Sequence, residues 1–172
     1  MARHRLNIKT ESRIRWKVYV RFGGEYLETG HDSMTRRRVL SLHMIWHRLD
    51  RTTLSREEFA TRLEIITSGE EWIIDGNYLH TMPLRLQCCD TVFFFDLPMN
   101  VCLAGAEERV GKECEDMPWT DETMNEEFRQ WIIDFLTQQL PVINSLLSEY
   151  KEKVKIIVFH TREEADIFIN GQ

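Results

Sequence analysis

The segment Trp72–Tyr78 reads Trp-Ile-Ile-Asp-Gly-Asn-Tyr, and the segment Cys89–Pro98 reads Cys-Asp-Thr-Val-Phe-Phe-Phe-Asp-Leu-Pro. In each, a short apolar run ends at a carboxylate, Asp75 in the first and Asp96 in the second. Continuous apolar runs rich in β-branched and aromatic residues are typical of strands buried on both faces of a parallel sheet. Ligands in such sheets bind at the carboxyl ends of the strands. The residues that follow the two runs are therefore the first candidates for a functional site.

The rest of the chain alternates between strand and helix patterns. Further strands are expected at 16–20, 39–42 and 154–159, and helices at 55–68, 82–88, 101–110, 125–139, 141–150 and from 161 onward. Ser55-Arg-Glu-Glu58 is a capping box that opens the first of these helices, and Thr161-Arg-Glu-Glu164 opens the last. This alternation predicts a three-layer α/β fold with a parallel sheet, in a single domain spanning residues 1–172.

The combination of these motifs resembles the P-loop nucleoside-monophosphate kinase superfamily. Within it, the chain is most similar to the small adenylate-kinase-like proteins labelled topology-modulation proteins. The resemblance covers residues 42–169 and rests on the order strand, Asp-Gly-Asn-Tyr, Thr, Arg, Asp, strand, Asp-x-Pro, helix, Arg. It implies about five strands in the order 2-3-1-4-5. It also implies transfer of phosphate from ATP, with Mg²⁺ as cofactor, to a small acceptor such as a nucleoside monophosphate.

On the acceptor side, the resemblance assigns roles to five residues. Asp75 is the expected catalytic carboxylate and would hold Mg²⁺ through a water, although a strand-end Asp can also cap the next turn. Gly76, Asn77 and Tyr78 would border the acceptor pocket, with turn formation as the alternative. Arg85 would clamp the acceptor phosphate, because a guanidinium group recognises phosphate in a bidentate way. A surface ion pair is the alternative for Arg85.

On the nucleotide side, Arg109 is expected to be catalytic and to contact the nucleotide phosphates, assisted by Lys112. A solvated helix end is the alternative for both, since basic residues suit a helix C-terminus. Residues 110–124 are polar and irregular and are expected to form a lid-like loop. Within it, Cys114 stands where many resembled proteins carry an Arg. Arg162 matches a position near the nucleotide base, with a solvated first-turn residue as the alternative.

The glycine-rich phosphate loop of the resembled family is missing from residues 1–41. That loop reads Gly-x-x-x-x-Gly-Lys-Ser/Thr and wraps backbone N–H groups and a lysine around phosphates. Here Gly23-Gly24 is present, but no Lys occurs between Lys17 and Lys112. Residues 1–41 are thus either a degenerate or a frame-altered N-terminal part, and a frame change after Val20 that recovers near Val39 is one explanation. The other is a catalytically inactive relative.

Charge separates a basic N-terminal part from an acidic remainder. Residues 1–40 hold ten Lys/Arg and four Asp/Glu, a net charge of +6, whereas residues 41–172 have a net charge of −12. The basic part suggests nucleic-acid binding as an alternative function, but the acidic remainder argues against a broad DNA-binding face.

No apolar run approaches the roughly 20 residues of a membrane span. The four cysteines contain no CxxC pair, so a cytoplasmic protein with reduced thiols and no membrane association is expected.

Two further patterns are assigned to structure rather than to chemistry. His43 and His47 have the i, i+4 spacing of a metal pair, but no third ligand is placed nearby, and the resembled proteins carry Asp where His43 stands. Helix 125–139 has an aromatic and aliphatic stripe that is expected to pack in the core rather than to stack on a base. Its members are Phe128, Trp131, Ile132 and Phe135.

Overall fold

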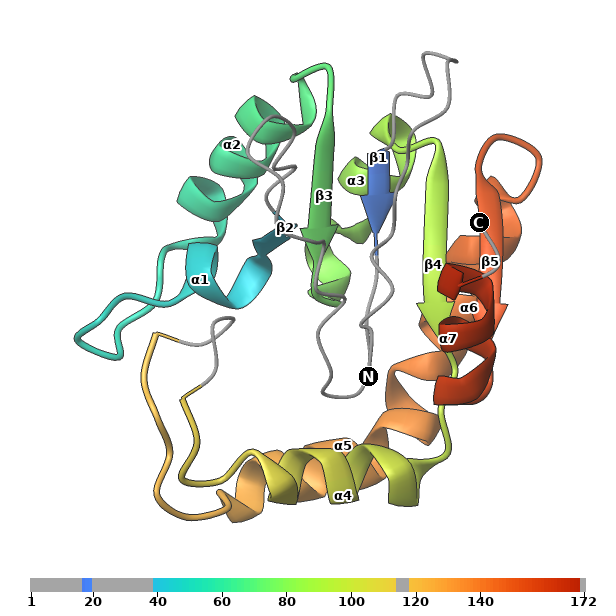
Figure 1. Ribbon diagram of the computed structural model, residues 1–172. Helices are drawn as coiled ribbons and strands as arrows, with labels where there is room; N and C mark the ends of the chain where they lie inside the picture. Colours follow the sequence, from blue (N-terminus) through green and yellow to red (C-terminus); the bar gives the residue numbers. More distant parts are fainter. Residues whose placement is uncertain (1–16, 20–38, 114–117, 171–172) are drawn as a thin grey trace.

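The computed structural model describes residues 17–19, 39–113 and 118–170 (Figure 1). Its strands are β1 (Lys17–Tyr19), β2 (Val39–Ser41), β3 (Trp72–Asp75), β4 (Thr91–Phe95) and β5 (Lys155–Phe159). Its helices are α1 (Leu42–Trp46), α2 (Arg56–Thr67), α3 (Met82–Cys88), α4 (Met99–Glu108), α5 (Glu126–Gln138), α6 (Leu140–Tyr150) and α7 (Arg162–Asn170), with a 3₁₀ turn, η1 (Leu79–Thr81). The α/β class predicted from the sequence is confirmed. The segment expected to hold the phosphate loop, and Cys114, lie outside the described residues.

The strands are short and parallel. β2 pairs with β3, β4 pairs with β5, and β1 pairs with both β3 and β4, so that the strand order is β2-β3-β1-β4-β5. The register places Ser41 beside Asp75 at the ends of β2 and β3. Because all pairs are parallel, the carboxyl ends of the strands share one edge of the sheet (Figure 1).

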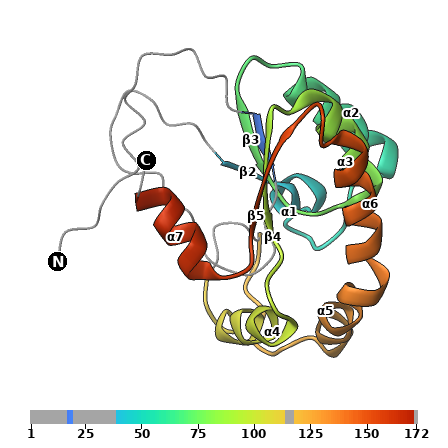
Figure 2. The ribbon, with the colours of Figure 1, turned by 90° about the vertical axis from the view of Figure 1, so that its right-hand side faces the viewer.

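Helices cover both faces of the sheet and cross its carboxyl edge. α2, α3 and α6 lie on one face, and α7 lies on the other (Figure 2). α4 and α5 contact each other and run across the edge where the strands end (Figure 1). The helix pair α4 and α5 therefore covers part of the carboxyl edge of the sheet.

Local signals explain why these elements form where they do. The Ser55 hydroxyl accepts a hydrogen bond from the Glu58 N–H, and the Glu58 carboxylate accepts one from the Ser55 N–H, which confirms the first predicted capping box. Phe59 and Leu63, one turn apart on α2, are fully buried against the sheet. At α7, Thr161 accepts from the Glu164 N–H as predicted.

The second capping box differs from the prediction in one bond. The Glu164 carboxylate accepts from the His160 N–H, one residue before the N-cap, instead of from Thr161. In the part of the chain that the structure describes, none of the helices has the length and apolar character needed to cross a bilayer.

Candidate functional site

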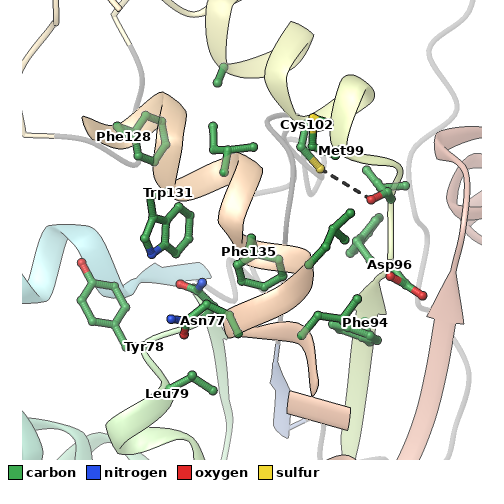
Figure 3. A pocket seen from close by; sticks show the side chains of 18 of the residues that line it. Asn77, Tyr78, Leu79, Phe94, Asp96, Met99, Cys102, Phe128, Trp131 and Phe135 are labelled. Atoms are coloured by element: carbon green, nitrogen blue, oxygen red, sulfur yellow. Dashed lines mark hydrogen bonds between the residues drawn. The ribbon is translucent and has the colours of Figure 1, made fainter. Parts of the chain in front are cut away.

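A cavity of about 600 Å³ lies at the carboxyl edge of the sheet (Figure 3). Its floor is the loop after β3 together with the end of β4, and its opposite wall is built by α4 and α5. Its position follows from the topology, because parallel strands open a crevice beyond their carboxyl ends. Five of the predicted site residues meet in its lining, namely Asp75, Gly76, Asn77, Tyr78 and Arg109.

Gly76 fixes the path of the loop that forms the cavity floor. Its φ of +129° is one that residues with a Cβ atom rarely adopt. A Cβ built on Gly76 would also lie 2.8 Å from the Cβ of Leu42. Leu42 is the first residue of α1 and is completely buried. Glycine is thus required both by the backbone and by the close approach of α1 to this loop.

Arg85 supports the loop from beneath and does not line the cavity. It has no exposed surface. Its Nη1 donates to the Gly76 carbonyl at 3.0 Å, and its Nη2 donates to the carbonyls of Tyr78 at 3.1 Å and Asn77 at 3.4 Å. Its Nε reaches the Thr81 carbonyl at 3.4 Å. The guanidinium group therefore satisfies backbone acceptors of a buried irregular segment, where the sequence predicted a clamp for the acceptor phosphate.

His43 meets Tyr78 at one side of the cavity. The Tyr78 hydroxyl lies 3.0 Å from His43 Nδ1, so α1 and the loop after β3 are joined by a side-chain hydrogen bond. The His43 ring also stacks on the His47 ring, with centroids 5.9 Å apart and an interplanar angle of 9°. His43 thus faces the cavity, where the resembled family carries Asp.

His80 lies on the same side of the cavity, in the 3₁₀ turn η1. Partial burial lowers its pKa below the usual 6.5, and the positive charges of Arg56 and Arg85 act in the same direction. Both effects disfavour the protonated ring, so His80 presents a neutral imidazole to the cavity at pH 7.

All four members of the α5 stripe line the cavity, but they differ in burial. Ile132 and Phe135 are 8% and 7% exposed, as predicted for core residues. Phe128 and Trp131 are 41% and 37% exposed and line the cavity, so the prediction of core packing is wrong for these two. Their rings stack with centroids 5.9 Å apart and planes 13° from parallel. The helical spacing identified the stripe, but it does not show which of its members are fully covered by neighbouring elements.

The predicted nucleotide-side residues are separated by the structure. Arg109 follows the last residue of α4 and lines the cavity. Lys112 is exposed, lies outside the lining, and its amine is 3.7 Å from the Glu108 carboxylate. Arg162 begins α7 and lies against α4, where a Cβ added to Gly105 would be 2.9 Å from its Nη2. Only Arg109 of these three reaches the cavity.

The lid-like loop contacts the loop between α1 and α2. The Gly111 N–H donates to the Asp121 carbonyl at 2.9 Å, which closes the base of the loop. The Trp119 ring packs edge-on against His47 with centroids 5.0 Å apart, and the Arg51 guanidinium carbon lies 5.4 Å from the Trp119 ring centroid. These contacts join the loop after α4 to the segment that follows α1. Residues 114–117 of the predicted loop lie outside the described part.

Asp96 and Cys102 complete the polar lining near β4. The Asp96 N–H donates to the Phe159 carbonyl at 2.9 Å, and its carboxylate lies 3.6 Å from His160 Nδ1. The Cys102 Sγ donates to the Leu97 carbonyl at 3.8 Å, and burial raises the pKa of this thiol. Cys88, Cys89 and Cys102 are free thiols, and burial raises the pKa of Cys89 to about 12. Cys89 and Cys102 are therefore protonated and poorly nucleophilic at neutral pH.

Among the described residues that line the cavity, the carboxylates are Asp75 and Asp96. Within residues 17–19, 39–113 and 118–170, no group of three His, Cys, Asp or Glu side chains is arranged to hold a metal ion. Mg²⁺ commonly uses one or two carboxylates and completes its shell with water and substrate phosphates. Asp75 at the end of β3 is compatible with that mode of binding.

Comparison of the chain with protein-family models, with curated proteins and with solved structures gives no significant match. The site is therefore interpreted from its own chemistry. It combines a polar floor, an aromatic wall and one arginine at a helix end, and it has the volume of a small-molecule pocket.

Proposed function

We propose that this chain is an ATP-dependent phosphotransferase of the adenylate-kinase-like class of P-loop kinases, and that the cavity holds its acceptor. One observation carries the proposal: the loop after β3, the end of β4 and Arg109 converge on a single cavity at the carboxyl edge of a parallel sheet. The strand order β2-β3-β1-β4-β5, which is the order implied by the family resemblance, supports it. The resemblance points to a nucleoside monophosphate as the acceptor.

The roles of the residues follow from what phosphoryl transfer requires. Mg²⁺-ATP would supply the phosphoryl group, and Asp75 would hold the Mg²⁺ through a water. Asn77 and Tyr78 border the acceptor and position it. Arg109 neutralises charge that develops on the transferred group. Phosphoryl transfer depends almost entirely on positioning and electrostatic stabilisation. A carboxylate, polar groups and an arginine are the kinds of side chain that provide these two effects.

A second candidate is a protein that binds the acceptor without transferring phosphate. The observation that favours it is the absence of Gly-x-x-x-x-Gly-Lys-Ser/Thr from the sequence. Removal of one oriented donor from a catalytic site costs about 10²–10³ in rate, and the phosphate loop contributes several. This candidate retains the cavity and the roles of Asn77 and Tyr78 but not those of Asp75 and Arg109.

The test is a phosphoryl-transfer assay on the full-length chain with Mg²⁺-ATP. The acceptors are the common nucleosides and their monophosphates, each read by mass spectrometry for a product heavier by one phosphoryl group. An Asp75→Asn variant purified in the same way controls for contaminating host kinases. Acceptor-dependent product that falls at least about 100-fold in the variant supports the kinase. No product above the variant, together with acceptor binding, supports the second candidate.

A further inference from the structure

The cavity wall on α5 presents flat aromatic surface to whatever occupies the cavity. Phe128 and Trp131 are each more than one-third exposed, and their rings are nearly parallel. Figure 3 shows the Trp131 ring projecting from α5 toward Asn77 and Tyr78 on the opposite side. A planar ring placed between these two sides would contact an indole on one face and polar groups at its edges. Purine and pyrimidine rings have that combination of an apolar face and a hydrogen-bonding edge.

The part of the cavity lining that the structure describes carries a single cationic Lys or Arg side chain. That side chain belongs to Arg109. Arg85, the residue expected to clamp the acceptor phosphate, is buried and donates to four backbone carbonyls. His80 is neutral at pH 7 because its pKa is lowered. Specific recognition of a phosphate dianion usually relies on several convergent donors or on bidentate arginine.

We infer that the acceptor is held by stacking of its ring on the Phe128–Trp131 wall, and that a phosphate on the acceptor contributes little to its affinity. The acceptor class is then an unphosphorylated ring compound of nucleoside type. This inference rests on the proposed function, because the ligand is an acceptor only if the chain transfers phosphate to it. The binding preference for an unphosphorylated ligand is measured without any transfer reaction. It also changes the acceptor implied by the family resemblance from a nucleoside monophosphate to a nucleoside.

The transfer step for such an acceptor is chemically balanced. An acceptor hydroxyl oxygen forms a bond to the γ-phosphorus of ATP, the bond from that phosphorus to the β,γ-bridging oxygen breaks, and ADP leaves. The hydroxyl proton is released to a cavity base or to water. No oxidant or reductant is needed, since the only reactants are the acceptor and ATP.

Calorimetric titration of the full-length chain with matched probes tests the inference. The probes are adenosine and adenosine 5′-monophosphate, and guanosine and guanosine 5′-monophosphate, each without ATP. For at least one base, the nucleoside is expected to bind with a dissociation constant within about threefold of that of its monophosphate, because a single arginine adds little to stacking. A monophosphate that binds more than about tenfold tighter than its nucleoside for both bases overturns the inference, and so does a complete lack of nucleoside binding.

Variants of the aromatic wall provide the second measurement. Trp131→Ala and Phe128→Ala are expected to weaken nucleoside binding by about tenfold or more, since base–aromatic stacking contributes on that scale. Both side chains are partly exposed, so the variants should fold. Ile65→Ala is the matched control, because Ile65 is exposed on α2 and outside the cavity lining. Unchanged affinity in both folded wall variants contradicts the stacking role.

The two proposals fail in different ways. Nucleoside binding that depends on Trp131, without phosphoryl transfer from Mg²⁺-ATP, rejects the kinase and leaves the binding inference in place. Phosphoryl transfer to monophosphates that bind more than about tenfold tighter than nucleosides rejects the inference and leaves the kinase in place.

Discussion

Arg85 Nη1 donates a hydrogen bond to the Gly76 carbonyl at 3.0 Å, from a guanidinium group that has no exposed surface. The two residues hold the cavity floor in complementary ways. Gly76 permits a backbone conformation that brings the loop against Leu42. Arg85 donates hydrogen bonds to the loop carbonyls that point toward its buried guanidinium group. A polar loop can therefore follow a buried strand end without unsatisfied acceptors.

Arg85→Met should destabilise the protein by about 3 kcal/mol, because the methionine leaves several buried carbonyls without donors. Arg129→Met is the control. Arg129 lies on α5 and forms surface ion pairs at 3.7 and 4.0 Å, which are worth less than about 1 kcal/mol. Urea denaturation followed by circular dichroism measures both. Equal stability of Arg85→Met and wild type would show that the loop does not need the guanidinium group.

Gly76→Ala and Gly111→Ala separate steric overlap from backbone strain. Both glycines have positive φ, +129° and +74°, but a Cβ at Gly111 has no neighbour within 4 Å. We expect Gly111→Ala to cost about 1 kcal/mol, from strain alone. Gly76→Ala should cost about 2–4 kcal/mol, because the Leu42 contact adds overpacking to strain. Thermal unfolding of the two variants gives the comparison, and a reversed order would contradict the geometry at Gly76.

Stability should fall as the pH is lowered from about 7.5 to 5.5, in part through His47. Burial lowers the pKa of His47 below its usual value of 6.5, so the unfolded chain binds more protons in this range. The contribution of neutral His47 to the free energy of unfolding is fully present above pH 6.5. It is lost as the pH falls through the lowered pKa of His47 in the folded state.

His47→Phe tests this assignment while keeping a ring against Trp119. The variant should show a smaller decrease in melting temperature over the same pH range than wild type. His80 shifts in the same direction, so the double variant with His80→Phe should show a smaller decrease still. Melting curves at the two pH values provide the measurement. An unchanged decrease in both variants would assign the pH dependence to other groups.

Arg109→Ala should reduce phosphoryl transfer by at least about 100-fold with little effect on folding. Arg109 lines the cavity at the end of α4, where a cation can stabilise charge on the transferred group. Lys112→Ala is the control, since its amine pairs with Glu108 on the surface and lies outside the lining. Its rate should stay within about threefold of wild type. Equal losses in the two variants would reject the specific role of Arg109.

The elements with strong local signals were predictable from the sequence. The apolar run that ends at Asp75 forms β3, and Met82–Cys88 forms α3 with the predicted limits. The Ser55 capping box begins α2 because the reciprocal bonds involve residues only three apart. Asp75, Gly76, Asn77 and Tyr78 reach the cavity because strand topology alone brings them to the carboxyl edge.

The roles that depend on side-chain direction were not predictable from the sequence. A pattern places Arg85 on a helix near the site, but it does not reveal that the carbonyls of the neighbouring loop point at that helix. Helical periodicity likewise groups Phe128 and Trp131 with core residues, whereas in the structure both are exposed and line the cavity. The assignment of the chain to the P-loop kinases stays a proposal.

Amide hydrogen exchange in the presence and absence of a saturating nucleoside tests most directly the claim that this cavity is a ligand site. We expect added protection in two segments that are distant in sequence and both line the cavity, 75–80 and 126–140. Trp131→Ala should clearly reduce that protection when the nucleoside concentration is set near the wild-type dissociation constant. Protection elsewhere with none in these two segments, or no protection at all, would contradict the assignment of the cavity as the ligand site.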